Sequence, residues 1–305
     1  MTCGAALYEN DEPMRREARL RILEWAVSVP SLFWLSLFFV IPTLLVFAIA
    51  LKPANPYGGI GSGWTLVNLE ALAGPVYLPV ALRTLWISFL SAAICLVLAA
   101  PTAYYLARVS ARWKNFLLML VIVPFWTNFL VRVFAWKALL HPEGPVKKLL
   151  VMAGLAGPAT PLLYNSAAVV LVTVYTYLPF TILPIYAAAE KFDFQLLEAA
   201  RDLGAGRFQA FRRVFLPGIR AGLLTGLLFV LIPALGSYVV PDLVGGPGGE
   251  MIGNKIAQRV FVDRNLPQAS ALSAVLILAV LAPLAAVLVL GRRRGRTGTV
   301  VGTGT

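Results

Sequence analysis

Long apolar runs, separated by short polar loops that carry many of the arginines and lysines, constrain this chain more than any other feature. The 305 residues are 59% hydrophobic and only 13% charged, which leaves too little polar surface for a soluble protein of this length. A run of about 20 apolar residues crosses a bilayer as a helix. The composition therefore predicts an all-α integral membrane protein.

The apolar runs predict six transmembrane helices, at residues 25–51, 79–107, 115–140, 165–189, 221–244 and 267–290. Together they form a transmembrane domain over 25–290, flanked by an N-terminal segment, 1–24, and a tail, 291–305. The first run is too long for the apolar part of a cleaved signal peptide, and no small-residue cleavage site follows it. We expect it to remain as the first membrane helix.

Basic residues gather on one side of these spans. The N-terminal segment, the loop after the second span, the polar segment 191–219 and the tail hold more than half of the 26 Lys and Arg residues. Loops rich in Lys and Arg stay in the cytosol during insertion. We therefore expect both termini and the segment 191–219 to be cytoplasmic. Short basic clusters between apolar runs also argue against nucleic acid as a partner, despite the net charge of +12.

The polar segment 191–219 lies between the fourth and fifth apolar runs. It predicts a short helix over 198–203, ended by Gly204 in the left-handed conformation, and Pro217 suits the first turn of the next helix. Three phenylalanines recur at helical spacing and predict one apolar face: Phe208, Phe211 and Phe215. The segment has the properties of a docking element, although spacing alone also allows an ordinary basic loop with a helical hairpin.

A specific motif runs through this segment: E-A-A, then a glycine, then a hydrophobic residue before L-P. Its residues are Glu198, Ala199, Ala200, Gly204, Val214, Leu216 and Pro217. This motif resembles the cytoplasmic signature of permeases of binding-protein-dependent (type I) ABC importers, with valine in place of the usual isoleucine. In that family the segment is a coupling helix seated in a groove on a separate ATPase subunit. The resemblance implies an ATPase-coupling role for this set, together with Arg201 and Asp202.

Two further stretches, 123–132 and 239–254, contain V-P-F-W-T-N, V-V-P-D-L-V-G-G and I-G-N. They resemble the first membrane subunit of spermidine/putrescine importers. The resemblance implies a translocation path for a polyamine at a bacterial inner membrane. It also implies a second permease subunit in a heterodimer, two ATPase subunits and an extracytoplasmic solute-binding protein, besides the membrane lipid.

A polyamine can pass along aromatic faces and oxygen atoms, since each cation–π contact contributes roughly 0.5–2 kcal/mol. The expected path residues are Trp126, Asn128, Tyr175, Tyr177, Tyr238 and Asp242. The aromatic residues among them are equally compatible with a role as interfacial anchors.

Pro124 and Arg132 lie in the third expected span. Pro124 should kink the helix, because it removes one backbone hydrogen bond. Arg132 is ionisable within a span and is therefore a functional candidate, but a fixed positive charge would repel a polyamine. We expect both residues to shape the gate, with Arg132 near the outer surface and paired with the partner permease.

Several motifs are absent from the sequence. No G-x-x-x-x-G-K-[ST] loop occurs, so ATP and Mg²⁺ belong to a partner subunit. The single histidine, His141, has no Cys/His cluster near it, so we expect no metal site and no cofactor bound by this chain. We therefore expect a transport subunit and not an enzyme.

Two alternatives to polyamine import stay open. A permease of the same class for another small solute, such as an anion or a metal complex, would share the coupling motif. A secondary transporter or channel working alone would need no ATPase and would leave the motif without a role.

Overall fold

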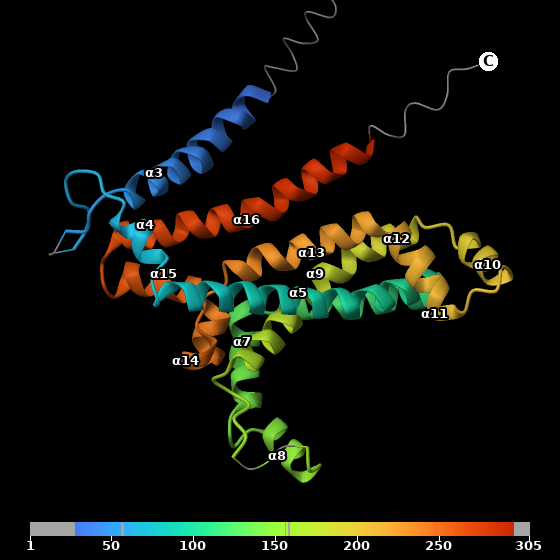
Figure 1. Cartoon of the computed structure of the whole chain (residues 1–305). Coiled ribbons are helices and arrows are strands. Elements are labelled where there is room, and N and C mark those ends of the chain that lie inside the picture. Colours follow the sequence, from blue (N-terminus) through green and yellow to red (C-terminus); the bar gives the residue numbers. More distant parts are fainter. Residues whose placement is uncertain (1–27, 56–57, 156, 158, 296–305) are drawn as a thin grey trace, which may run out of the picture.

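Helices, joined by turns and irregular loops, make up most of the part that the structure describes. The computed structural model describes residues 28–55, 58–155, 157 and 159–295. Within these ranges the only extended pairing is one bridge between Ala54 and Ile60, and no strand forms. The expected all-α fold is confirmed, with three helices packed together at its centre (Figure 1).

The central helices are α5 (Tyr77–Arg108), α9 (Ser166–Glu190) and α13 (Arg220–Leu235), and each packs against the other two (Figure 1). Small side chains let membrane helices approach closely, which matters because lipid gives apolar side chains little reason to cluster. The buried face of α5 is made largely of such residues: Thr84, Ser88, Ser91, Ala92, Cys95, Ala99 and Ala103.

Two glycines of α13 permit its contact with α9. A Cβ atom on Gly222 would lie 2.5 Å from the Cβ of Ala188 and 2.8 Å from the carbonyl oxygen of Pro184. A Cβ on Gly226 would lie 3.1 Å from a methyl group of Thr181. The G-x-x-x-G spacing therefore fixes how closely the two helices pack.

The N-terminal helix Ser28–Ala50, whose last part is α3 (Ile41–Ala50), lies beside α16 (Leu266–Gly295) and to one side of the central bundle (Figure 1). Ala50 is buried against alanines of α16. Most other side chains of this helix are exposed, including Phe38 and Phe39, which are 63% and 67% exposed. So large an apolar surface suits lipid or another membrane subunit.

Shorter helices cap the two ends of the bundle. At one end are α10 (Gln195–Asp202), α11 (Arg207–Ala210), the π-helix η3 (Phe211–Phe215) and α12 (Leu216–Gly218). At the other end are α4 (Val67–Leu72), the π-helix η4 (Pro241–Gly245), α14 (Gly246–Gly249) and α15 (Ile252–Phe261). Four helices form the third expected span and the loop after it: α6 (Ala111–Ile122), the 3-10 helix η2 (Val123–Trp126), α7 (Phe129–Leu140) and α8 (Pro145–Met152).

The third expected span, 115–140, is not the single kinked helix that Pro124 led us to expect. The helices before and after Thr127–Asn128 meet at 91°. Pro124 lies in the first turn of η2, and the chain turns where Thr127 adopts an extended conformation, with ψ of 148°. The change of direction is therefore a break between two helices and not the loss of one hydrogen bond.

The fifth expected span, 221–244, also differs from the structure, because α13 stops at Leu235. At 1.5 Å per residue its 16 residues reach about 24 Å, which is less than the roughly 30 Å hydrocarbon core of a bilayer. An irregular stretch, 236–238, follows before helical structure resumes.

Three described helices are long and apolar enough to cross a membrane alone, and two bent pairs bring the number to five. The apolar stretch found in α16 covers Leu266–Leu281. The expected count of six stays a prediction. The expected N-terminal segment, 1–24, and residues 296–305 of the expected tail lie outside the described residues.

Candidate coupling segment and outer pocket

α10 is a short helix with one buried side and one exposed side. Leu197 is 6% exposed and packs into the apolar cluster at this end of the bundle, whereas Glu198, Ala199 and Asp202 are exposed. The sequence predicted this helix correctly, although it begins three residues earlier than expected. Its exposed side carries small and acidic residues.

Gly204 ends α10 in the left-handed conformation that the sequence predicts, with φ of 89°. Its N–H donates to the carbonyl of Arg201 at 2.9 Å, and the N–H of Ala205 donates to the carbonyl of Ala200 at 3.0 Å. These two bonds form a Schellman motif. A Cβ on Gly204 would meet no atom within 4 Å, so the backbone conformation and not lack of space requires glycine here.

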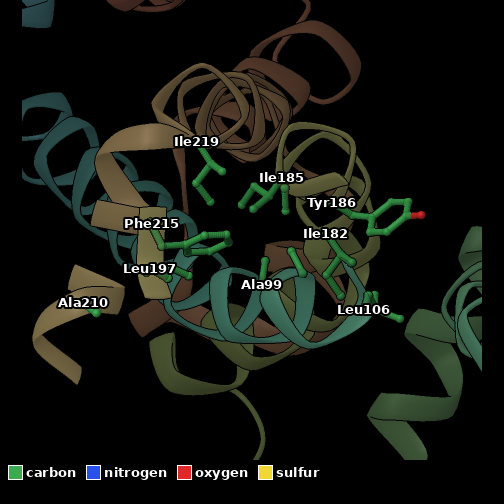
Figure 2. Close-up of a cluster of buried hydrophobic side chains, with 11 residues drawn as sticks. Ala99, Leu106, Ile182, Ile185, Tyr186, Leu197, Ala210, Phe215 and Ile219 are labelled. Carbon is green, nitrogen blue, oxygen red and sulfur yellow. The ribbon is translucent and has the colours of Figure 1, made fainter. Parts of the chain in front are cut away.

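Aromatic rings tie this segment to the central helices. The ring of Phe215, which is fully buried, lies 5.0 Å from that of Tyr104 in α5 and 5.3 Å from that of Phe192, between centroids. Phe194 and Phe211 complete the aromatic cluster. Figure 2 shows Phe215 among the other buried side chains of this region. Each such ring pair contributes about 0.5–1.5 kcal/mol beyond burial, so the segment is firmly joined to the bundle.

One phenylalanine departs from the expected apolar face. Phe208 is 75% exposed and makes no ring contact with the aromatic cluster among the described residues. Phe208 lies in α11, before the π-helix η3, whereas Phe211 and Phe215 at the two ends of η3 both join the cluster, so the predicted face holds for two of the three phenylalanines.

The last three residues of the motif differ in how far they are buried. Val214 and Leu216 are half-buried against the apolar cluster, and Pro217 is exposed in the first turn of α12. A Cβ on Gly218 would lie 2.3 Å from the ring of Phe192. The position of Pro217 was predicted correctly, but the 76° bend that precedes α13 was not.

Tyr238 and Asp242 line one pocket, of about 550 Å3, at the opposite end of the bundle. Glu250 also lines it, but its carboxylate pairs with the ammonium group of Lys255 at 2.8 Å. The carboxylate of Asp242 has no ion pair among the described residues. This pocket, which we call the outer pocket, thus combines an aromatic ring with a carboxylate that forms no ion pair among the described residues.

Sequence reasoning missed the side of the outer pocket that α15 provides. Asn254, Gln258 and Phe261 come from this helix. The amide of Asn254 donates to the carbonyl of Tyr238 at 3.1 Å, which joins α15 to the irregular stretch after α13. The I-G-N stretch was the available signal, but only the tertiary structure shows what it faces.

Two expected path residues, Trp126 and Asn128, lie at the break between η2 and α7 and not in the outer pocket. Trp126 is 81% exposed. The side-chain oxygen of Asn128 accepts a hydrogen bond from the N–H of Leu130 at 2.8 Å and so caps α7. The structure therefore gives Asn128 a local role in starting a helix.

The two expected tyrosines of α9 contact neighbouring rings. Tyr175 packs edge-on against Trp136, with centroids 5.2 Å apart. Tyr177 is half-buried, and its ring lies 6.4 Å from that of Phe180. Neither lines the outer pocket.

Arg132 lies in α7 just after the break. Its guanidinium carbon is 5.1 Å from the centre of the Phe125 ring, and its Nε is buried without a hydrogen-bond partner in the described chain. The carbonyl of Pro124 accepts a hydrogen bond from the Thr127 hydroxyl at 2.6 Å. At the break, the carbonyl of Pro124 thus has a hydrogen-bond partner, whereas the Nε of Arg132 has none in the described chain.

No group of three or more His, Cys, Asp or Glu side chains that could hold a metal ion occurs where the structure describes the chain. The structure instead has a short, partly exposed helix at one end and a polar pocket at the other, joined by long apolar helices. This arrangement is that of a membrane transport component. Residues 96–294 match the family of binding-protein-dependent transport system inner membrane components, and the chain belongs to this family.

Curated relatives agree with this assignment. The chain is 38% identical over 248 residues to the spermidine/putrescine transport system permease protein PotB of Haemophilus influenzae, covering 81% of this chain and 87% of the relative. It is 36% identical over 240 residues to PotB of Escherichia coli, covering 79% and 87%.

A solved structure has the same fold. The bacterial alginate ABC transporter, crystallised with an alginate pentasaccharide-bound periplasmic protein, has a chain that superposes with a TM-score of 0.69 at 17% identity. The match covers 91% of this chain and 96% of that one. The protein is thus a multi-pass inner-membrane transport subunit and not an enzyme, and its family depends on a binding protein.

Proposed function

We propose that this chain is one of two permease subunits of an ATP-driven importer and that it forms part of the path for a polyamine such as spermidine or putrescine. The observation that carries the proposal is the segment 191–219, here called the coupling segment, in which an exposed helix with a left-handed glycine cap is fixed by buried rings to the central helices. The polyamine assignment rests on the similarity to the PotB proteins over four fifths of the chain.

Force enters the chain at α10. The docking residues are Glu198, Ala199, Ala200, Arg201, Asp202 and Gly204. The rest of the motif, Val214, Leu216 and Pro217, connects this helix to the apolar cluster and to α12. When two ATPase subunits close around ATP and Mg²⁺, α10 moves with the groove that holds it. The aromatic cluster then passes this displacement to α5 and α9, and the path opens alternately to the two sides of the membrane.

The outer pocket is the entrance of the path in this chain. Irregular backbone at membrane depth is tolerated where it lines a cavity, and the stretch after the short helix α13 meets this condition. Asp242 offers a charge-assisted hydrogen bond to an ammonium group, and Tyr238 offers a ring face. Trp126, Asn128, Tyr175 and Tyr177 belong to the path only if the second permease encloses them.

The break at Thr127–Asn128 belongs to the gate. Arg132, held over Phe125, has a buried donor that no group within the described residues uses. A carboxylate or carbonyl of the second permease would complete it, which favours a heterodimer interface beside Pro124 and Arg132. The arginine then shapes the gate without contacting the substrate.

The topology that fits this function has six spans and cytoplasmic termini. Adding α16 to the five spans or bent pairs gives the sixth. The coupling segment and the outer pocket lie at opposite ends of the bundle, as a protein working between a cytosolic ATPase and an extracytoplasmic binding protein requires (Figure 1).

Uptake in proteoliposomes tests the proposal. The vesicles contain this chain, the second permease, the ATPase and the binding protein, with ATP inside and radiolabelled spermidine outside. We expect ATP-dependent accumulation that unlabelled putrescine inhibits and molybdate does not. Accumulation by this chain alone would contradict the importer, whereas inhibition by molybdate but not putrescine would contradict only the polyamine assignment.

A further inference from the structure

A pocket of about 460 Å3 lies between the end of α5 and the coupling segment, on the inner side of α10. Three arginines from three helices line it: Arg108, Arg201 and Arg207. No acidic residue lines it, and none of the described salt bridges includes any of the three. Guanidinium groups that share one pocket repel one another, so an anion between them would be strongly stabilised.

Arg108 is already held in place for such an anion. One of its nitrogens donates to the hydroxyl of Tyr104 at 2.6 Å. Its guanidinium carbon lies 5.4 Å from the centre of the Tyr104 ring and 5.7 Å from that of Phe194. The remaining N–H groups are free to donate, since a guanidinium has five and a hydrogen bond to Tyr104 uses one. Little side-chain freedom would be lost on binding.

Arg201 is the one residue of the proposed docking set that lines this pocket. Arg201 follows Leu197 by four residues, and both line the pocket, so this side of α10 faces α5. Glu198 and Asp202 do not line it and remain exposed elsewhere on the helix. A ligand in the pocket therefore contacts the inner side of α10 while an ATPase contacts the other.

We propose that Arg108, Arg201 and Arg207 form a binding site for a phosphate group. Arginine is suited to phosphate because its planar donors match the oxygens two at a time. The phosphate is supplied by an anionic phospholipid of the cytosolic leaflet or by a soluble phosphate compound. Because Arg108 belongs to α5 and the other two arginines to the coupling segment, a bound phosphate clamps this segment to the bundle.

The test uses the assembled importer and two charge-neutralising variants. Arg207→Gln removes one side of the pocket, and because Arg207 is exposed, folding should be preserved. Arg212→Gln is the matched control, since Arg212 is exposed in the same segment but does not line the pocket. Each importer is placed in nanodiscs of phosphatidylcholine, with or without phosphatidylglycerol.

Two measurements identify the source of the phosphate. Native mass spectrometry counts the phosphatidylglycerol that stays bound, and equilibrium binding of radiolabelled inorganic phosphate is measured in phosphatidylcholine alone. We expect Arg207→Gln to weaken one of these by about tenfold, as loss of a charge-assisted hydrogen bond predicts, with Arg212→Gln unchanged. Loss of lipid retention identifies the headgroup, and loss of phosphate binding alone identifies a soluble source.

Equal lipid retention and equal phosphate binding in all three importers would overturn the site. Loss of ATPase co-purification in Arg207→Gln, with unchanged lipid and phosphate binding, would also overturn it and would assign the pocket to an acidic side chain of the ATPase. Neither measurement depends on the transported solute. The phosphate site and the polyamine assignment can therefore fail separately.

Discussion

At the coupling end of the bundle, buried aromatic rings fix the connecting segment to α5 and α9, whereas at the outer end the helices are interrupted and surround a polar pocket. Phe215 is fully buried at the first end, while Tyr238 at the second is 49% exposed. A tightly packed element transmits displacement, and an irregular one can change shape around a solute. We infer from this contrast that the coupling end moves as one body, whereas the residues lining the outer pocket can rearrange, even though Val240 and Val244 at the same end are fully buried.

The largest effect is expected from removing one ring of the aromatic cluster. Phe215→Ala should lower the free energy of unfolding in detergent by about 3–5 kcal/mol, because it removes a fully buried ring from a packed site. Phe208→Ala is the control, since this side chain is 75% exposed and its loss should change stability by less than about 0.5 kcal/mol. Equal losses in the two variants would contradict the difference in packing.

A second comparison places one methyl group at each end of α13. Gly222→Ala should destabilise the protein by about 1–3 kcal/mol, because its Cβ would lie 2.5 Å from that of Ala188. Gly236→Ala, at the outer end, meets no atom within 4 Å and should be tolerated. Thermal unfolding of the purified variants measures both effects. A neutral Gly222→Ala would show that α9 and α13 are not held at this distance.

A smaller effect is expected at the outer pocket, where folding should be unaffected. Asp242→Asn removes the unpaired carboxylate and should raise the KM for spermidine uptake roughly fivefold, equivalent to about 1 kcal/mol. Glu143→Gln provides the control, because Glu143 is exposed in a loop and does not line the pocket. An unchanged KM for Asp242→Asn would remove this residue from the path.

The sequence predicted the coupling segment better than the outer end for a physical reason. The helix at 198–202 and its cap at Gly204 depend on signals within a few residues, so their conformation followed from local rules. The break at Thr127–Asn128 did not, because apolar residues continue on both sides of it and hydropathy does not register a change of direction. Pro124 drew attention to the correct region but not to the correct residue.

The outer pocket required the tertiary structure. Tyr238, Asp242 and Asn254 meet there from either side of a glycine-rich stretch whose path is not specified by periodicity. The same holds for the aromatic cluster, in which Tyr104 of α5 contacts rings more than 85 positions further along the chain. Long-range packing of this kind is absent from any local pattern.

Force should reach the membrane helices through α10, and a change at Gly204 tests this coupling most directly. Gly204→Asp places a side chain on a backbone with φ of 89°, which costs about 1–2 kcal/mol and distorts the docking helix. Gly206→Asp is the matched control, because Gly206 has φ of −64° and no atom within 4 Å of an added Cβ. In the reconstituted importer we expect Gly204→Asp to insert normally, to lose spermidine uptake and to retain less ATPase on co-purification, with Gly206→Asp close to wild type. Normal uptake by Gly204→Asp would show that α10 does not transmit the force.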